Sequence, residues 1–178
     1  MKPILVIFDG SNFYHCAKRL APKVHLTNFN YYKLAQTICN HNNPNVEYCV
    51  GEIRKERHNP KSVKLYSQQQ ALFYNLEQQN ITIRKGYMLK HNSVYTEKGV
   101  DVRIAVDILR GALKDEFSRC FVVSSDTDII PAITDARKTR KKIIYVGFKD
   151  FISHAMRANC TGAYIITKQI LNCCQKCQ

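Results

Sequence analysis

The sequence predicts an α/β fold, a three-layer sandwich on a mainly parallel sheet of five to six strands in the Rossmann-like order 3-2-1-4-5. Short apolar, β-branched runs alternate with segments whose apolar residues recur at helical spacing, which is typical of parallel strands joined by crossover helices. The 178 residues suffice for one domain with a full core. We expect this domain to span residues 1–170, followed by a short cysteine-rich tail over 171–178.

The expected strands are short apolar runs bounded by turn residues or polar segments. In chain order they cover residues 3–8, 46–53, 81–89, 120–125, 143–148 and 163–167. The expected helices cover residues 13–20, 31–39, 62–79, 100–113, about 127–139 and 152–158. Ser11 or Asn12 is the expected N-cap of the first helix and Thr127 of the fifth. Pro131 fits in the first turn of that fifth helix.

The charge balance is strongly basic, with 27 Lys and Arg against 14 Asp and Glu, a net charge of +13. Such a charge favours polyanionic partners, with nucleic acid ahead of an anionic membrane surface. No apolar stretch approaches the length needed to cross a membrane. We therefore expect a nucleic-acid partner and no membrane.

Eight cysteines are spread over the chain, which has neither a secretory signal pattern nor a small core that would need disulfides. Reduced thiols in a cytoplasmic protein are the expectation. Cys174 and Cys177 form a Cys-x-x-Cys pair, but zinc usually takes four ligands and no histidine follows His154. A zinc site is not expected.

Four acidic residues fall at the ends of predicted elements. Asp9 ends the first strand, and Asp126 and Asp128 follow the fourth, which neighbours the first in the expected strand order. Asp101 lies in the first turn of the helix after Gly99. Each acid taken alone is also consistent with helix capping. Together they would repel one another unless a cation neutralised them, and oxygen ligands of this kind suit Mg²⁺ or Mn²⁺.

Asp107 lies on the same predicted helix as Asp101 but about 120° around its axis. It is therefore expected to point elsewhere. A buried ion pair with an arginine or lysine is the favoured interpretation.

Three motifs together resemble the NYN domain, a branch of the PIN-like metal-dependent ribonucleases. They are FDGSN at 8–12, KGVDV at 98–102 with Asp107 behind it, and SSDTDI at 124–129. The resemblance covers nearly the whole chain. It implies a PIN-like fold and an endoribonuclease in which Mg²⁺ or Mn²⁺ is held by Asp9, Asp101, Asp126 and Asp128. A glycine is frequent before the first Asp of the third motif, whereas this chain has Ser125.

The same resemblance implies RNA as substrate, either single-stranded or structured, and products that carry a 5′-phosphate. Asn12 would orient the substrate or a water molecule. Exposed basic clusters would hold phosphates, and tyrosines would stack on unpaired bases. The residues expected to contact the substrate are Ser11, Asn12, Arg54, Lys55, Arg57, Lys98, Ser124, Arg137, Lys138 and Arg140. A homodimer is one open option for the oligomeric state.

The principal alternative is a catalytically silent RNA-binding or scaffold module on the same fold. A phosphatase with an aspartyl nucleophile would want a second aspartate two residues after Asp9, where Ser11 stands. Dehydrogenases and P-loop NTPases would need a glycine-rich phosphate loop, which the sequence does not contain.

Overall fold

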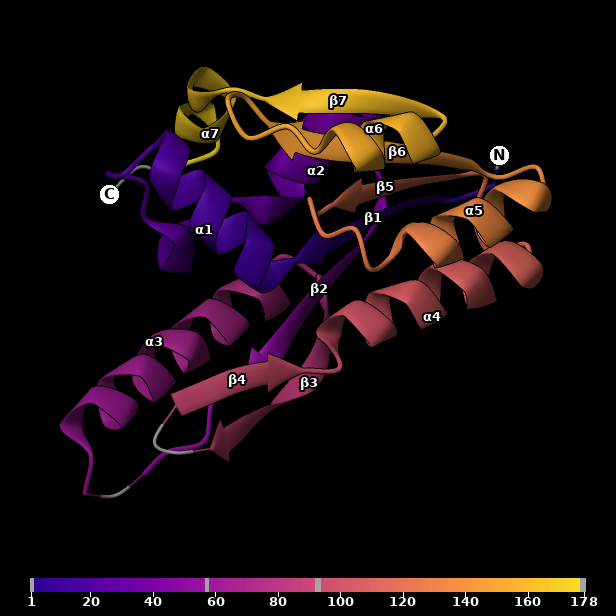
Figure 1. Ribbon diagram of the computed structural model, residues 1–178. Helices are drawn as coiled ribbons and strands as arrows, with labels where there is room; N and C mark the ends of the chain where they lie inside the picture. The colour runs from indigo at the N-terminus through magenta and orange to yellow at the C-terminus, as the bar shows by residue number, and fades with distance from the viewer. Residues whose placement is uncertain (1, 57, 92–93, 177–178) are drawn as a thin grey trace.

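The computed structural model describes residues 2–56, 58–91 and 94–176. Within these ranges the strands form one seven-stranded sheet in the order β4-β3-β2-β1-β5-β6-β7 (Figure 1). The strands are β1 (Ile4–Asp9), β2 (Asn45–Glu52), β3 (Thr82–His91), β4 (Val94–Lys98), β5 (Arg119–Val123), β6 (Lys142–Phe148) and β7 (Gly162–Ile166).

The sheet is mixed, because six strands run parallel and β4 pairs antiparallel with β3. The first five parallel strands follow the expected order 3-2-1-4-5, which places β1 between β2 and β5. The expected strand number of five to six is wrong. The additional strand is β4, which lies in a polar segment without the apolar run that marks the other strands. It is held as a strand by its pairing with β3, in which Tyr87 lies opposite Lys98 and Leu89 opposite Thr96.

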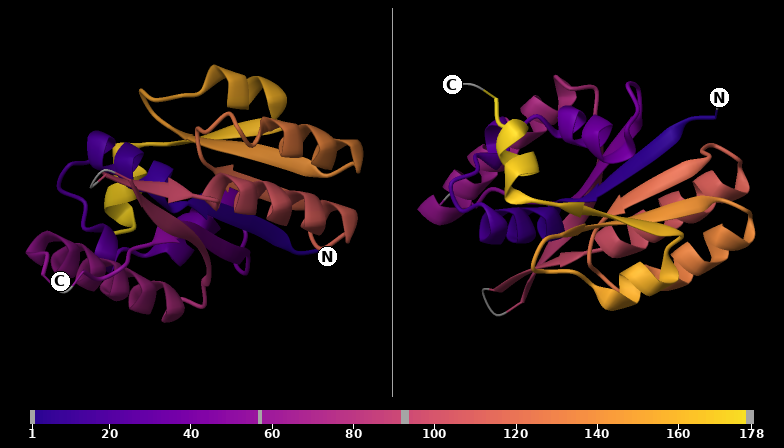
Figure 2. Two further views of the ribbon diagram at one scale, coloured as in Figure 1. Left: turned by 60° about the horizontal axis from the view of Figure 1, so that its bottom comes forward. Right: turned by 90° about the horizontal axis from the view of Figure 1, so that it is seen from above.

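Helices cover both faces of the sheet (Figures 1 and 2). One face carries α1 (Gly10–Leu20), the 3₁₀ turn η1 (Leu26–Asn28), α2 (Tyr31–Cys39), α3 (Pro60–Glu77) and α7 (Lys168–Cys173). The other carries α4 (Val100–Leu113), α5 (Ile130–Lys138) and α6 (His154–Asn159). No helix in the described ranges is long and apolar enough to span a membrane.

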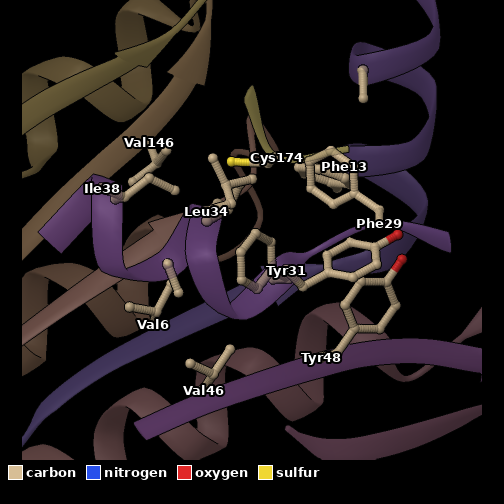
Figure 3. Packing of buried hydrophobic residues seen from close by; sticks show 14 of the residues in the cluster. Val6, Phe13, Phe29, Tyr31, Leu34, Ile38, Val46, Tyr48, Val146 and Cys174 are labelled. Carbon is tan, nitrogen blue, oxygen red and sulfur yellow. The ribbon is translucent and has the colours of Figure 1, made fainter. Parts of the chain in front are cut away.

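A buried aromatic cluster fixes α1 and α2 on the first face (Figure 3). Phe13 of α1 lies edge-on to Phe8 of β1, with ring centroids 5.4 Å apart. Tyr31 at the start of α2 packs against Tyr48 of β2 at 5.2 Å. Such aromatic pairs contribute about 0.5–1.5 kcal/mol each beyond the area they bury. The cluster therefore holds the beginning of α1 rigidly at the tip of β1.

The caps of α1 and α5 differ from expectation. Asp9, rather than Ser11 or Asn12, caps α1 by accepting a hydrogen bond from the Asn12 backbone N–H. Thr127 does not cap α5, which begins only at Ile130 and has no side-chain cap. The residues between β5 and α5 instead form a tight turn stabilised by the carboxylate of Asp126.

The C-terminal segment packs onto the core, although the sequence predicts a tail there. Helix α7 buries Leu171, and Cys174 after it is also buried in the first-face cluster. The Asn30 backbone N–H donates to the Cys174 carbonyl at 2.9 Å. The seven cysteines in the described ranges are free thiols, while Cys177 of the Cys-x-x-Cys pair lies outside those ranges.

Gly10, the first residue of α1, lies so close to β2 that a side chain does not fit. A Cβ there would lie 2.6 Å from Tyr48 Cε1 and 2.9 Å from the Cys49 carbonyl oxygen. We expect Gly10→Ala to lower the free energy of unfolding by about 1–3 kcal/mol, measured by urea denaturation. Gly162→Ala is the matched control, since a Cβ at Gly162 meets nothing within 4 Å. Equal stability of the two variants would contradict the expectation.

Candidate active site

The site is built around Asp9, the last residue of the central strand β1. Asp9 is only 8% exposed. Oδ1 accepts a hydrogen bond from the Asn12 backbone N–H at 3.0 Å, and Oδ2 accepts one from Ser124 Oγ at 2.8 Å. Both oxygens are thus held, and the carboxylate is fixed at the carboxyl edge of the sheet, where open α/β folds bind ligands.

The turn after β5 brings a second acid beside Asp9. Phe8 of β1 pairs with Val123 of β5, so Ser124 is the next residue along and faces Asp9. The Asp126 backbone N–H donates to Ser124 Oγ at 3.1 Å, and Asp126 Oδ1 accepts from the Asp128 N–H at 3.0 Å. A continuous chain of hydrogen bonds therefore links Asp9 through Ser124 to the turn that carries Asp126 and Asp128.

Asn12 connects helix α1 to the same turn. Its side-chain oxygen accepts a hydrogen bond from the Ser125 backbone N–H at 3.1 Å. The Ser125 hydroxyl lies 3.0 Å from the Tyr145 hydroxyl, which in turn accepts from the Ser153 N–H at 2.9 Å. Ser125 is not among the residues with positive φ. The backbone here therefore does not require the glycine that is frequent in the family motif.

Glu97 of β4 is a third acid near Asp9, and it was not among the residues expected at the site. Its carboxylate accepts a hydrogen bond from the Gly51 N–H of β2. A Cβ on Gly51 would lie 2.8 Å from Glu97 Oε1, so the missing side chain makes room for the acid. The pairing of β3 with β4 puts Glu97 opposite Met88.

The negative charges of Asp9 and the neighbouring carboxylates are not offset by a basic side chain among the causes that shift the pKa of Asp9. Burial is the largest cause that raises the pKa of the Asp9 carboxyl, to about 6, and the nearby carboxylates of Glu97 and Asp126 add to it. The hydrogen bonds from Asn12 and Ser124 act in the opposite direction. In the folded protein the ionised form of the Asp9 carboxyl is disfavoured. A bound hard cation such as Mg²⁺ or Mn²⁺, which prefers oxygen ligands, would stabilise that ionised form.

The four aspartates expected to form one cluster are only partly brought together. Asp9 and Asp126 interact, and Asp128 is exposed on the same turn. Asp101 lies half-buried in the first turn of α4, which starts beside β3 after Gly99 turns the chain at a φ of +79°. Among the described residues no three His, Cys, Asp or Glu side chains form a group that could share a metal ion. The carboxylate oxygens near Asp9 are the type of ligand that a hard cation prefers. The described residues do not, however, bring three such side chains together around one position.

Several expected substrate contacts lie at or next to the carboxyl edge of the sheet. Ser11 is half-buried at the start of α1, and Lys98 is exposed at the end of β4. Arg54 and Lys55 are exposed in the loop after β2. Arg57 lies outside the described residues.

The second basic cluster lies at the opposite edge. Arg137 and Lys138 end helix α5, and Arg140 precedes the start of β6, so all three lie at the amino ends of the strands. Arg137 donates to the Asn159 carbonyl at 2.6 Å, and Lys138 pairs with Asp135 at 2.7 Å. These residues do not surround Asp9, and we exclude them from the candidate site.

Asp107 forms the buried ion pairs expected for it. Its side chain is 1% exposed and lies 2.9 Å from Arg103 Nε and 2.7 Å from Arg110 Nη2. Arg84 of β3 approaches the same carboxylate at 3.6 Å and also pairs with Glu47. Asp107 therefore joins α4 to the sheet.

Comparison with known proteins agrees with this architecture. A solved structure of a protein of unknown function from Vibrio parahaemolyticus is similar in fold, with a TM-score of 0.67, 16% sequence identity and coverage of 93% of each chain. Comparison with curated proteins gave no match. The model of the NYN domain family matches residues 3–168, nearly the whole chain. The chain therefore belongs to the NYN domain family.

Proposed function

We propose that this protein is a metal-dependent endoribonuclease that hydrolyses RNA phosphodiester bonds at the Asp9 site. The observation that carries the proposal is the buried Asp9 carboxylate, whose pKa is raised to about 6 by burial and by neighbouring Glu97 and Asp126. Membership of a nuclease-like family and the net charge of +13 support RNA as the substrate. A cytoplasmic location, expected from the cysteine content, is part of the proposal.

In this proposal Asp9 and Asp126 hold a Mg²⁺ or Mn²⁺ ion, with Asp101, Asp128 and Glu97 as the remaining candidate carboxylates. When bound, the ion would lower the pKa of a coordinated water and offset charge on the scissile phosphate. Ser124 fixes the orientation of the Asp9 carboxylate through the bond to Oδ2. Hydrolysis would leave a 5′-phosphate on the product.

Asn12 is the proposed positioning residue for substrate. Its side-chain oxygen is committed to the Ser125 N–H, which fixes the orientation of the amide. The Nδ2 group has no hydrogen-bond acceptor among the residues that the structure describes, so it remains available to donate to a phosphate oxygen. Ser11, beside it at the start of α1, and exposed Lys98 would contact the same phosphate backbone.

Cleavage of end-labelled single-stranded RNA in Mn²⁺ and in EDTA tests the proposal. We expect cutting only with the metal, and a loss of about 10²–10⁴-fold in rate for Asp126→Asn, because a metal centre supplies several kcal/mol of transition-state stabilisation. Asp135→Asn is the matched control, since Asp135 is exposed on α5 and pairs with Lys138. Cleavage by Asp126→Asn at the rate of the unmodified protein would refute the assignment.

A silent RNA-binding module is the second candidate. It is favoured by one observation, that the described residues do not gather three metal-binding side chains into one group. RNA binding of equal strength in Mn²⁺ and EDTA, without cutting in either, would support this function over the first.

A further inference from the structure

Two adjoining cavities lie on the sides of helix α3 near the candidate site. One, of about 460 Å³, lies between the loop after β2, the start of α3 and the β3–β4 hairpin, and Arg54, Lys61 and Tyr95 line it. The other, of about 280 Å³, lies between α1 and α3, with Tyr14 and Gln68 in its wall. Ile53 and Leu65 line both. The two cavities are therefore neighbours on either side of Ile53 and Leu65, and together they are named the α3 groove here.

Each part of the α3 groove has a lining residue that is next to a residue of the candidate active site in sequence or in space. Gly10 and Ser11, the residues directly after Asp9, line the smaller cavity. Met88 lines the larger one, and its sulfur lies beside the same Gly51 position that Glu97 approaches. A chain lying in the smaller cavity would thus contact Gly10 and Ser11, from which it could continue over the carboxyl edge of the sheet toward Asp9.

The walls of the groove expose apolar and aromatic surface. Tyr14 is 49% exposed, Leu65 is 43% exposed and Tyr95 is 37% exposed. A polar amide interrupts this surface, because Gln68 is exposed on α3 in the lining of the smaller cavity. Tyrosine faces next to amides are suited to unpaired bases, which stack on aromatic rings and hydrogen-bond through their edges.

The rim of the groove is positively charged. Arg54 and Lys61 are exposed in the lining of the larger cavity, and neither has an ion-pair partner in the described parts of the chain. The Tyr95 hydroxyl in the same lining donates a hydrogen bond to Glu56. The first turn of α3 also contains no acidic residue. This positive rim is complementary to a phosphate backbone whose bases point into the groove.

We propose that the α3 groove binds single-stranded RNA and leads the strand to Asp9. The proposal rests on the proposed function for its choice of RNA. It adds the binding path and the preference for an unpaired strand. The bases stack on Tyr14 and Tyr95, while Arg54 and Lys61 hold the phosphates. A duplex is excluded from this mode, because its bases are paired and stacked inside the helix and cannot reach the tyrosines.

Fluorescence anisotropy with a labelled short single-stranded RNA tests the path without any cleavage. The protein carries Asp126→Asn and the buffer contains EDTA, so binding is measured separately from hydrolysis. We expect Tyr14→Ala to weaken the affinity by about fivefold or more, the loss associated with one base–aromatic stack. Leu65→Asp, which places a negative charge inside the groove, should weaken it by at least as much.

Matched controls use exposed residues of the same type that line neither cavity. Tyr74→Ala lies on the same helix, where Tyr74 is 66% exposed, and Leu113→Asp lies on α4, where Leu113 is 74% exposed. Both should leave the affinity unchanged, and a duplex of the same sequence should compete poorly. Absence of RNA binding, equal loss in groove and control variants, or equal competition by the duplex would overturn the inference.

The inference and the proposed function can fail separately. Groove-dependent binding without cutting by the unmodified protein in Mn²⁺ would keep the RNA path and reject the nuclease. Metal-dependent cutting with Tyr14→Ala and Leu65→Asp as active as the unmodified protein would keep the nuclease and reject the path.

Discussion

Asp9→Asn is expected to stabilise the fold and to inactivate the enzyme at once. At about pH 8 the free energy of unfolding should rise by about 3 kcal/mol, because a pKa raised from 3.8 to about 6 means that the ionised Asp9 carboxylate is disfavoured in the folded state. The metal-dependent cleavage rate should fall about 10³-fold, since the substituted amide no longer supplies a carboxylate to the ion.

The raised pKa of Asp9 also predicts how the free energy of unfolding changes with pH. Between about pH 4 and 6 the folded protein binds a proton at Asp9 that the unfolded chain has released, so the stability of the unmodified protein falls as the pH rises through this window. Asp9→Asn has no such proton. The stability difference between the two proteins should therefore be small near pH 4 and largest above about pH 6.

Urea denaturation of both proteins near pH 4 and pH 8 measures this difference. Saturating Mn²⁺ at the higher pH should stabilise the unmodified protein and leave Asp9→Asn unaffected. If Asp9→Asn is less stable than the unmodified protein at high pH without metal, the ionised Asp9 carboxylate does not destabilise the folded state, and the prediction is wrong.

Asp107→Asn is expected to lower the free energy of unfolding by about 3–5 kcal/mol, the cost of removing one partner from a buried ion pair. The change leaves Arg84, Arg103 and Arg110 close together without the carboxylate they share. Urea denaturation measures the loss. Asp135→Asn is the control, because its exposed pair with Lys138 should contribute about 1 kcal/mol at most.

Activity separates Asp107 from the candidate catalytic acids. Where Asp107→Asn is still folded, its metal-dependent cleavage rate should match that of the unmodified protein, since its contacts are to arginines of α4 and β3. A large loss of cleavage in the folded variant would mean that the ion-pair network also shapes the site.

The central part of the fold was predictable from local signals. The apolar run before Asp9 and the run before Ser124 each mark a buried strand, and the common strand order 3-2-1-4-5 makes the two neighbours. In the structure Phe8 pairs with Val123, which brings Asp9 close to Asp126 as the expected strand order implied. The ion pair of Asp107 was also predictable, because helix periodicity turns it away from Asp101.

Features that depend on contacts distant in sequence were not predictable in the same way. Glu97 comes near Asp9 only because the β3–β4 hairpin forms and Gly51 lacks a side chain, and neither condition is visible in the residues around Glu97. Arg137 looked like part of a substrate-binding cluster until the direction of α5 put it at the other edge of the sheet. The six-residue helix α7 was too short to give a periodic signal, and Leu171 and Cys174 secure it by burial.

The fit of Glu97 against Gly51 has an evolutionary consequence. Since a Cβ on residue 51 would meet the carboxylate, a larger residue there is tolerated only after residue 97 has become shorter or has turned away. The two positions should therefore change together among homologues, and the order of the two substitutions is constrained. A lineage that gains a side chain at 51 will already have given up the third acid beside Asp9.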